Sequence, residues 1–202
     1  METYIEQVQN RKEKIYLDFI SKRVDDLKGI NKPSLLKDKV WDSFYIEDVA
    51  DIISGRDIYE AERINGELPY ISSTANNNGI GYFVGNNNLT LEKECLSVNR
   101  NGSVGYSFYH PYNALFSNDC RKLRPKFKSR YVGLFLSNQI TQQKDKYGYG
   151  YKMGTARLKK QKIMLPINIK GEPDYKYMEQ YMKYIEYVKL SAYIKFKKKK
   201  SI

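Results

Sequence analysis

The chain has 202 residues, with 35 Lys and Arg against 23 Asp and Glu, a formal net charge of +12 and a sequence pI near 9.4. Apolar residues make up 41% of it and no apolar run approaches the roughly 20 residues of a membrane-spanning helix, so a disordered tail and a membrane protein are both excluded. The length fits one globular domain with helical extensions, and so basic a chain favours nucleic acid or another polyanion as its partner.

Residues 3–28 predict one long amphipathic helix. Its apolar residues lie three, four or seven positions apart, in two adjacent sets: Ile5, Val8, Ile15 and Phe19, then Ile20, Val24 and Leu27. The helix should end at Gly29. We therefore assign residues 1–31 to an N-terminal helix and residues 32–40 to a linker broken by Pro33. The N-terminal residues lack the apolar core of a signal peptide, so we expect a cytoplasmic protein.

Residues 41–170 predict a mixed, strand-rich domain. Gly and Asn punctuate this stretch, and short β-prone runs occur at 69–72, 81–84, 96–100, 104–109 and 163–165. Residues 129–143 keep helical spacing at Tyr131, Leu134, Phe135 and Asn138 after a Ser at the N-cap position, which predicts one helix packed on the sheet. We expect Cys95 and Cys120 to lie in its core, because two thiols cannot build a disulfide framework.

Residues 171–202 predict a second long helix with a Lys tail at 197–200. Pro173 is suited to the first helical turn, and apolar residues recur at helical spacing as far as Ala192. The expected fold class is therefore α+β, with one strand-rich domain flanked by long helices. Each helix carries an apolar stripe too wide for a single partner helix. The residues expected to form a dimer or partner surface are Ile15, Phe19, Val24, Met178, Tyr181, Met182, Ile185 and Val188.

Catalytic motifs are missing from the sequence. A single histidine, His110, excludes a paired-His metal site. Pro173-Asp174 has no separate carboxylates for a nuclease metal, there is no phosphate-binding loop, and Gly148 and Gly150 are followed by Met153 where a dinucleotide fingerprint needs a third glycine. We therefore expect no activity of the chain alone, no metal and no cofactor.

Positive charge is concentrated in one segment. Residues 121–162 contain 13 Lys and Arg against one Asp or Glu, whereas residues 1–60 contain 10 against 13 and residues 61–120 contain 3 against 5. Within this segment, the stretch 144–157 alternates Lys and Tyr with Gly. Its candidate contacts to DNA are Lys144, Lys146, Tyr149, Lys152 and Arg157. Lys and Arg neutralise phosphates and Tyr can stack on a base, although a packed Tyr-Gly turn explains the same pattern equally well.

Two further stretches offer short polar side chains. The loop 70–79 contributes Ser73, Thr74, Asn76, Asn77 and Asn78, and from composition alone it is more often an ordinary turn. Asn101-Gly102 is the strongest hairpin signal in the chain and would place Arg100 at a hairpin tip, with Ser103 beside it. Arg100 and the Asn residues are the candidates for base edges, because Arg pairs bidentately with guanine and Asn with adenine.

Taken in order, four stretches resemble a type I restriction-modification specificity subunit. They are GELPYISSTANNNGI (66–80), LSVNRNGSVGYSFYHPYNALFSNDC (96–120), GYGYKMGTARLKKQKIMLPIN (148–168) and GEPDYKYMEQYM (171–182). The resemblance implies a non-catalytic target recognition domain that reads one half of a split site in double-stranded DNA. It also implies helices that set the distance between the two halves and dock the methyltransferase subunit and, through it, the restriction subunit.

The sequence departs from that family in length. It has one recognition domain where the family usually has two, so we expect either a homodimer or pairing with a different half subunit. Two other functions stay open. One is a nuclease or methyltransferase targeting domain on a single chain, which the missing motifs disfavour. The other is a basic protein-interaction module that binds an acidic partner, as an antirestriction or assembly factor would.

Overall fold

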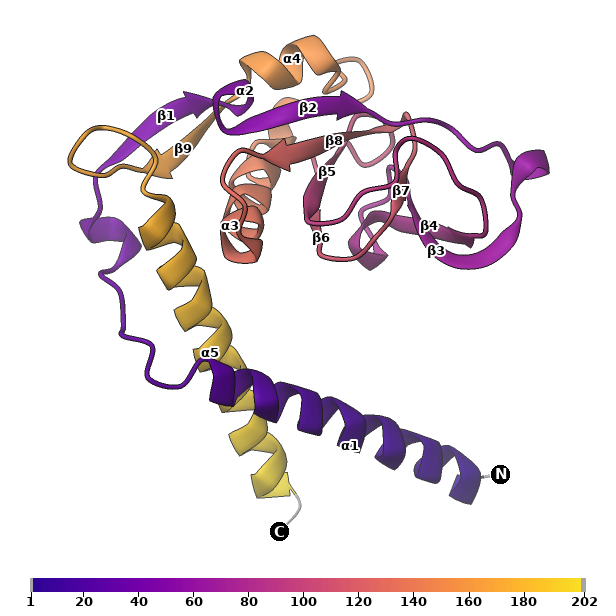
Figure 1. The fold of residues 1–202 in the computed structure, drawn as a ribbon, viewed down its shortest axis with the longest axis vertical. Coiled ribbons are helices and arrows are strands. Elements are labelled where there is room, and N and C mark those ends of the chain that lie inside the picture. The colour runs from indigo at the N-terminus through magenta and orange to yellow at the C-terminus, as the bar shows by residue number, and fades with distance from the viewer. Residues whose placement is uncertain (1, 201–202) are drawn as a thin grey trace. The chain divides into compact units, whose positions relative to one another are not determined.

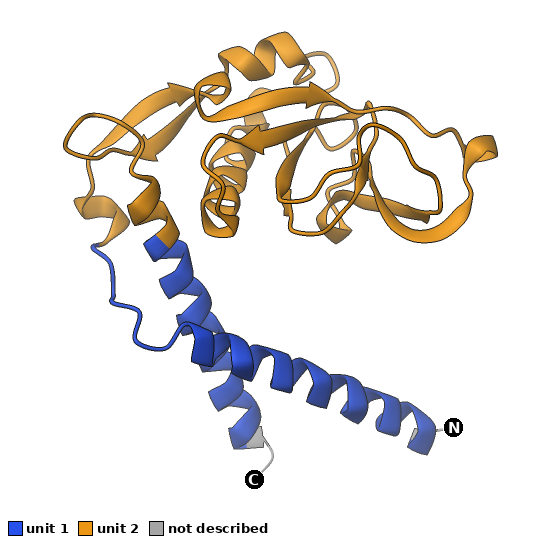
Figure 2. Ribbon diagram, viewed as in Figure 1, with its two compact units in different colours: residues 1–34, 180–202 blue, residues 35–179 orange. Residues whose placement is uncertain are grey.

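The computed structural model describes residues 2–200, which fold into helices and small sheets (Figure 1). They divide into two compact units, shown in Figure 2. The first, which we call the helical unit, consists of the residues up to 34 and those from 180 onward. The second, the sheet unit, spans residues 35–179.

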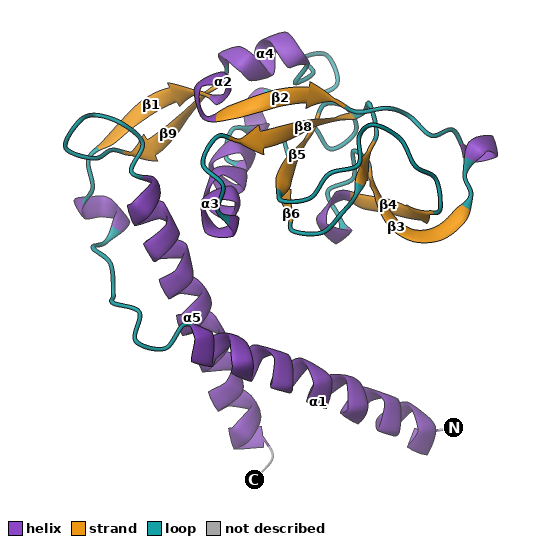
Figure 3. Ribbon diagram, in the orientation of Figure 1, coloured by secondary structure: helices purple, strands orange, loops and turns teal. Residues whose placement is uncertain are grey.

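The elements follow the chain as drawn in Figure 3. The helical unit contains α1 (Glu2–Asp26) and the larger part of α5 (Tyr175–Lys200). The sheet unit contains η1 (Leu36–Asp38), β1 (Trp41–Tyr45), α2 (Ile46–Val49), β2 (Ala50–Ser54), η2 (Glu60–Glu62), β3 (Asn65–Ile71), η3 (Asn77–Gly79), β4 (Ile80–Val84), β5 (Cys95–Asn99), β6 (Ser107–His110), β7 (Leu115–Phe116), β8 (Cys120–Pro125), α3 (Arg130–Thr141), η4 (Lys144–Lys146), α4 (Thr155–Lys160) and β9 (Lys162–Pro166). The expected α+β class, with long helices at both ends of the chain, is confirmed.

The strands of the sheet unit form three small sheets within the described residues. β1 pairs with β9, and a four-stranded antiparallel sheet runs in the order β2-β8-β5-β6. The third sheet has the order β4-β3-β7, with β3 antiparallel to β4 and parallel to β7. Every residue of β5 is buried, so this strand is the centre of the core. Cys95 and Cys120 are both buried there, as predicted.

Helix α3 packs against β5, β6 and β9. Of the predicted positions, Tyr131 and Phe135 are buried, Leu134 is half-buried and Asn138 is exposed. The buried face is wider than predicted, because it also includes Val132, Leu136 and Ile140. Gly133 allows the close approach to β6, because a Cβ there would lie 2.5 Å from the Tyr109 ring. The predicted Ser cap is wrong in detail. Ser129 stands at the N-cap, but its hydroxyl donates to Glu179 at 3.2 Å and makes no capping bond.

Helix α5 begins in the sheet unit, two residues after Pro173 and not at it. Asp174 caps the helix, since one carboxylate oxygen accepts a bond from the Tyr177 N–H at 3.1 Å. The other oxygen pairs with Lys39 Nζ at 2.8 Å. No helix in the described part of the chain is long and apolar enough to cross a membrane.

Within the helical unit, α1 and α5 run antiparallel. Glu13 pairs with Lys197 at 2.7 Å and Arg23 with Glu186 at 3.2 Å, and the rings of Tyr16 and Tyr193 meet edge to face. Of the two predicted apolar sets on α1, the structure buries the second, through Ile20 and Leu27 and partly through Val24. On α5, Met178 is fully buried and Tyr181, Met182 and Ile185 are partly buried.

Three residues of the first apolar set stay on the surface of the helical unit, whereas Val8 is half-buried. Ile15 is 60% exposed and Phe19 is 61% exposed, and Ile5 lies on the surface with them. Val188 on α5 is also exposed. A single chain therefore leaves part of the predicted stripe uncovered.

The single histidine is a core residue. His110 is fully buried, its Nε2 lies 2.9 Å from the Ser97 hydroxyl, and its ring packs edge to face on Phe116. Burial lowers the pKa of His110 to about 4, from an ordinary value of 6.5. The ring is therefore neutral at physiological pH, with one nitrogen protonated and the other a hydrogen-bond acceptor.

Acid should destabilise the fold through this residue. The unfolded chain takes up a proton near pH 6.5 and the folded chain only near pH 4, so stability is full above pH 6.5 and is lost as the pH falls. We expect the free energy of unfolding to drop by roughly 2 kcal/mol between pH 7 and pH 5. Denaturant unfolding at both pH values measures it. The control is His110→Gln, which should remove most of the drop, because the chain has no second histidine.

Candidate nucleic-acid interface

The structure brings the three predicted polar stretches together on the sheet unit. The Ser103 N–H donates to the Ser73 carbonyl at 3.1 Å, and Asn99 Nδ2 donates to the Thr74 carbonyl at 3.0 Å. On its other side the second stretch meets the third, because a Cβ at Gly105 would lie 2.7 Å from the Cα of Lys144. Residues 72–79, 99–106 and 144–157 therefore form one continuous set, which we call the three-loop surface.

The first loop is shaped by its asparagines. Asn77, Asn78 and Gly79 all adopt positive φ, at 50°, 54° and 76°. Asn tolerates this left-handed region better than other non-glycine residues, so the run NNNG has a backbone explanation. The side chains of Asn76, Asn77 and Asn78 are exposed, whereas Ser73 and Thr74 are half-buried beside the second loop. The asparagines therefore form a turn through their backbone and still leave their side chains exposed for contacts with DNA.

The second loop is longer than the predicted two-residue hairpin. Pairing of β5 with β6 ends at Val98 and Ser107, and only Gly102 of the central pair has positive φ, at 55°. The chain bends this way because Asn101 is bound elsewhere, by the turn between β7 and β8, and not by its own hairpin. Arg100 is consequently half-buried and does not stand at a tip.

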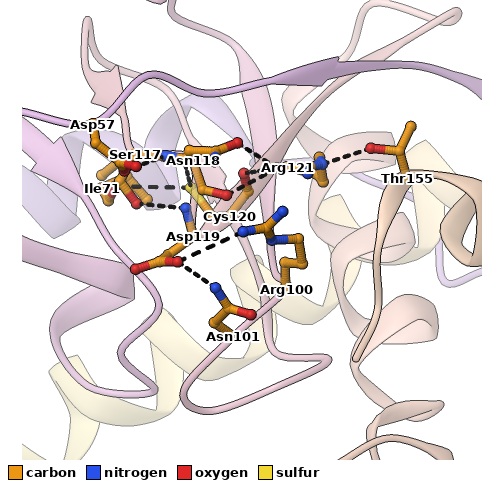
Figure 4. A network of polar contacts seen from close by, with 10 residues as sticks. All are labelled: Asp57, Ile71, Arg100, Asn101, Ser117, Asn118, Asp119, Cys120, Arg121 and Thr155. Atoms are coloured by element: carbon orange, nitrogen blue, oxygen red, sulfur yellow. Dashed lines mark hydrogen bonds and ion pairs between the residues drawn. The ribbon is translucent and has the colours of Figure 1, made fainter. Parts of the chain in front are cut away.

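That turn, Ser117–Cys120, together with Arg121 next to it, connects the three loops, and it was not predicted from the sequence (Figure 4). The Ser117 N–H donates to the carbonyl of Ile71, where the first loop begins, at 2.9 Å. The Asp119 carbonyl accepts from the N–H groups of Arg100 and Asn101, at 2.9 and 3.2 Å. The signal in the sequence is the turn-forming run Ser-Asn-Asp between two short strands.

Arg121, the residue after the turn, reaches the third loop. Its Nε donates to the Thr155 hydroxyl at 2.7 Å and its Nη1 to the Asn118 carbonyl at 2.9 Å. The side chain is buried, and burial, followed by the nearby charge of Arg100, lowers its pKa. A guanidinium stays charged even so, and here its charge is stabilised by carbonyl and hydroxyl oxygens. Arg121 thus fastens α4 to the turn.

The third loop presents cations and aromatic rings. Tyr149 is 94% exposed between two glycines, while Tyr147 and Tyr151 stack with ring centroids 5.6 Å apart. Arg157 lies over the Tyr151 ring at 4.0 Å. Lys146, Lys152 and Arg157 are exposed and Lys144 is half-buried beside Tyr106. A cavity of about 630 Å³ is lined by the cations Lys146, Arg157, Lys160 and Lys162.

Chemistry beyond binding finds little support among the described residues. No group of three or more His, Cys, Asp or Glu in residues 2–200 could hold a metal ion. Burial raises the pKa of both Cys95 and Cys120 to about 12, so neither thiol is a nucleophile at neutral pH. What the surface offers is cations, amides and hydroxyls, which is the chemistry of phosphate and base contacts.

Comparison with known proteins decides the family. The model of the type I restriction modification DNA specificity domain matches residues 38–195. The chain belongs to this family. A curated relative, the specificity subunit S.BcgI of a type II restriction enzyme from Heyndrickxia coagulans, is 40% identical over 188 residues, which cover 92% of this chain and 53% of that protein. The predicted resemblance to the specificity family of restriction-modification systems is therefore confirmed.

Solved structures share the fold. The S subunit of a type I restriction-modification system from M. genitalium is 16% identical, with a TM-score of 0.57 over 98% of this chain and 54% of that one. The HsdS subunit from Thermoanaerobacter tengcongensis is 14% identical, with a TM-score of 0.53 over 100% of this chain and 51% of that one. The chain therefore spans about half the length of these relatives.

The contact between the second and third loops should depend on Gly105. Its φ is +83°, and a Cβ would collide with the backbone of Lys144. We expect Gly105→Ala to lower the free energy of unfolding by about 1–3 kcal/mol, through strain and the displaced loop. Gly150→Ala is the matched control, because a Cβ there meets nothing within 4 Å. Chemical denaturation of both variants measures the difference, and equal stabilities would contradict the contact.

Proposed function

We propose that this chain reads one half of a bipartite site in double-stranded DNA through the three-loop surface. The observation that carries the proposal is that one turn, Ser117–Cys120 with Arg121, joins two polar loops and one strongly basic loop into a single surface. Phosphate contacts position a protein on DNA and base contacts specify the sequence, so such a surface needs both kinds of side chain side by side.

The exposed cations of the third loop are suited to phosphates. Lys146, Lys152 and Arg157 lie on the surface with few acidic neighbours in the segment, and the exposed ring of Tyr149 is free to contact sugar or base. The asparagines of the first loop and Arg100, Asn101 and Ser103 of the second are the proposed base-reading group. This division assigns affinity to the third loop and specificity to the other two.

We also propose a methyltransferase subunit, and through it a restriction subunit, as the protein partners. The support is membership of the specificity family, together with a helical unit that is a separate compact unit from the one that contains the three loops. The family model is described as type I, whereas the relative S.BcgI is named as the subunit of a type II restriction enzyme, so we propose the partners by chemistry and not by system type. Co-purification with the methyltransferase encoded nearest to this chain tests the partnership.

A second copy of the chain, or a different half subunit, would supply the other half of the site. The uncovered apolar residues Ile15 and Phe19 on α1 and Val188 on α5 are the proposed pairing surface. Antiparallel helix pairs bury such stripes by forming four-helix contacts, which a two-fold homodimer completes. Self-pairing predicts a split palindrome as the target.

Substitutions should separate affinity from specificity. Lys152→Glu should weaken binding to all duplexes about equally and flatten its salt dependence, whereas Arg100→Ala should cost roughly 1–3 kcal/mol on the preferred site and much less elsewhere. Selection of bound duplexes from a random pool defines the preferred site, and titration at several salt concentrations measures both effects.

The same titrations decide between the rival functions. Binding without sequence preference would favour a protein-interaction module, and equal losses on all sequences for Arg100→Ala would make Arg100 a phosphate contact. Incubation with plasmid, Mg²⁺ and S-adenosylmethionine is the control for catalysis. Cleavage or methylation by the purified chain alone would show that it is an enzyme and would contradict the proposed non-catalytic function.

The pairing surface makes a separate prediction. We expect a dimer by light scattering at tens of micromolar protein, and a monomer for Phe19→Glu, because a charge at an apolar contact costs several kcal/mol. Lys14→Glu, an exposed position on the same helix, is the matched control and should stay dimeric. A monomeric wild type would rule out the homodimer and leave pairing with a different half subunit.

A further inference from the structure

Asp119 holds the second loop with both its backbone and its side chain. Its carbonyl accepts bonds from the N–H groups of Arg100 and Asn101, at 2.9 and 3.2 Å. Its carboxylate Oδ1 accepts from Asn101 Nδ2 and lies 3.9 Å from Arg100 Nη2. Two consecutive side chains of the proposed base-reading group are therefore held by one carboxylate, as Figure 4 shows.

This arrangement leaves hydrogen-bonding groups unused. Arg100 Nε and Asn101 Oδ1 are both buried and have no hydrogen-bond partner among the described residues. A buried unpaired polar group costs about 1–3 kcal/mol, so the two side chains would adopt other arrangements if the carboxylate did not hold them. Asp119 engages one of the two hydrogens on Asn101 Nδ2, so the carboxylate fixes how the second hydrogen and Oδ1, the pair that would bind adenine, are oriented.

The side chain of Asp119 lies where DNA would bind under the proposed function, with further cations nearby. The Asp119 side chain is 49% exposed and borders a cavity of about 360 Å³ that Ser72 and Tyr82 also line. Arg121 places a second guanidinium close to Arg100, and it is itself bonded to Thr155 of the basic third loop. An arginine released at this position would reach for any phosphate, because phosphate offers a bidentate partner regardless of sequence.

We propose that Asp119 is a positioning residue for specificity: its carboxylate holds Arg100 and Asn101 in one arrangement and keeps Arg100 from serving as a general phosphate contact. This inference rests on the proposed function. DNA that enters the site disturbs the contacts of Asp119 with Arg100 and Asn101. Only a base edge that matches the held arrangement of these side chains compensates for that loss. Asp119 therefore lowers affinity for all DNA while raising discrimination between sequences. Specificity of this kind depends on penalising wrong partners as well as on contacts to the right one.

Asp119→Asn tests the proposal, since it removes the charge and keeps the shape. We expect affinity for random duplexes to rise and the ratio of preferred-site to random affinity to fall by about tenfold. The fold should survive, because the backbone bonds from Asp119 remain after any substitution and the side chain is half-exposed. Asp119→Ser serves as a second variant, and thermal melting checks both.

The matched control is Asp145→Asn. Asp145 is 86% exposed, pairs with Lys144 at 2.8 Å, and carries the same charge on the same surface without touching the base-reading group. Its removal should raise affinity for all duplexes and leave the ratio unchanged. If Asp119→Asn behaves like Asp145→Asn, the carboxylate contributes only its charge and the proposal is wrong.

Combined substitutions distinguish positioning from direct reading. In a background that carries both Arg100→Ala and Asn101→Ala, Asp119→Asn should cause little further loss of discrimination, because the carboxylate acts through these two side chains. A full additional loss would mean that Asp119 reads a base itself, which would also overturn the proposal. A wild type with no sequence preference at all is a different result, since it would refute the proposed function before any variant is compared.

Discussion

The three-loop surface depends on the hydrogen bonds made by one short turn between two buried strands. Ser117 bonds the end of β3, where the first loop begins, Asp119 bonds the second loop, and Arg121, next in the chain, bonds the third, which is also held by the buried Met153. Buried polar groups need partners, and a network in which each member restrains the next gives loops a defined shape that apolar contacts do not give. The sheets provide the anchor for this network. The turn is flanked by β7 and β8, whose residues are paired or buried, so the turn has little freedom to move.

Sequence patterns predicted the three longest helices and the strands β3, β4, β5, β6 and β9, but they missed β1, β2, β7 and β8. The last of these shows why. Its sequence, CRKLRP, contains three cations and looks like a solvated segment. The structure buries two of them: Lys122 pairs with Glu92 at 2.6 Å, and Arg121 is surrounded by carbonyl and hydroxyl oxygens. A charge can lie in a core only when its partner is in place, and Glu92 is thirty residues away in the chain. Local periodicity does not contain that information.

The helices show the same limit in another form. Both apolar sets on α1 have good helical spacing, and nothing in the spacing says which one faces α5. In the observed register, which buries Ile20 and Leu27, the pairs Glu13–Lys197 and Arg23–Glu186 also form, and these contacts join residues far apart in the chain. For the candidate site, the sequence predicted the residue types and the three stretches. It did not predict that Asn101 is bound by a distant carboxylate, because its neighbours in the sequence fit an ordinary hairpin just as well.

Several of the bonds that join the loops end on main-chain carbonyls. Ser73, Thr74 and Asp119 all accept through the backbone, so these bonds do not depend on which side chain stands at those positions. The surface can therefore exchange its exposed residues, one at a time, while the frame that supports them is conserved. Under the proposed reading function, this separation would let the exposed contact residues be substituted without loss of the folded frame.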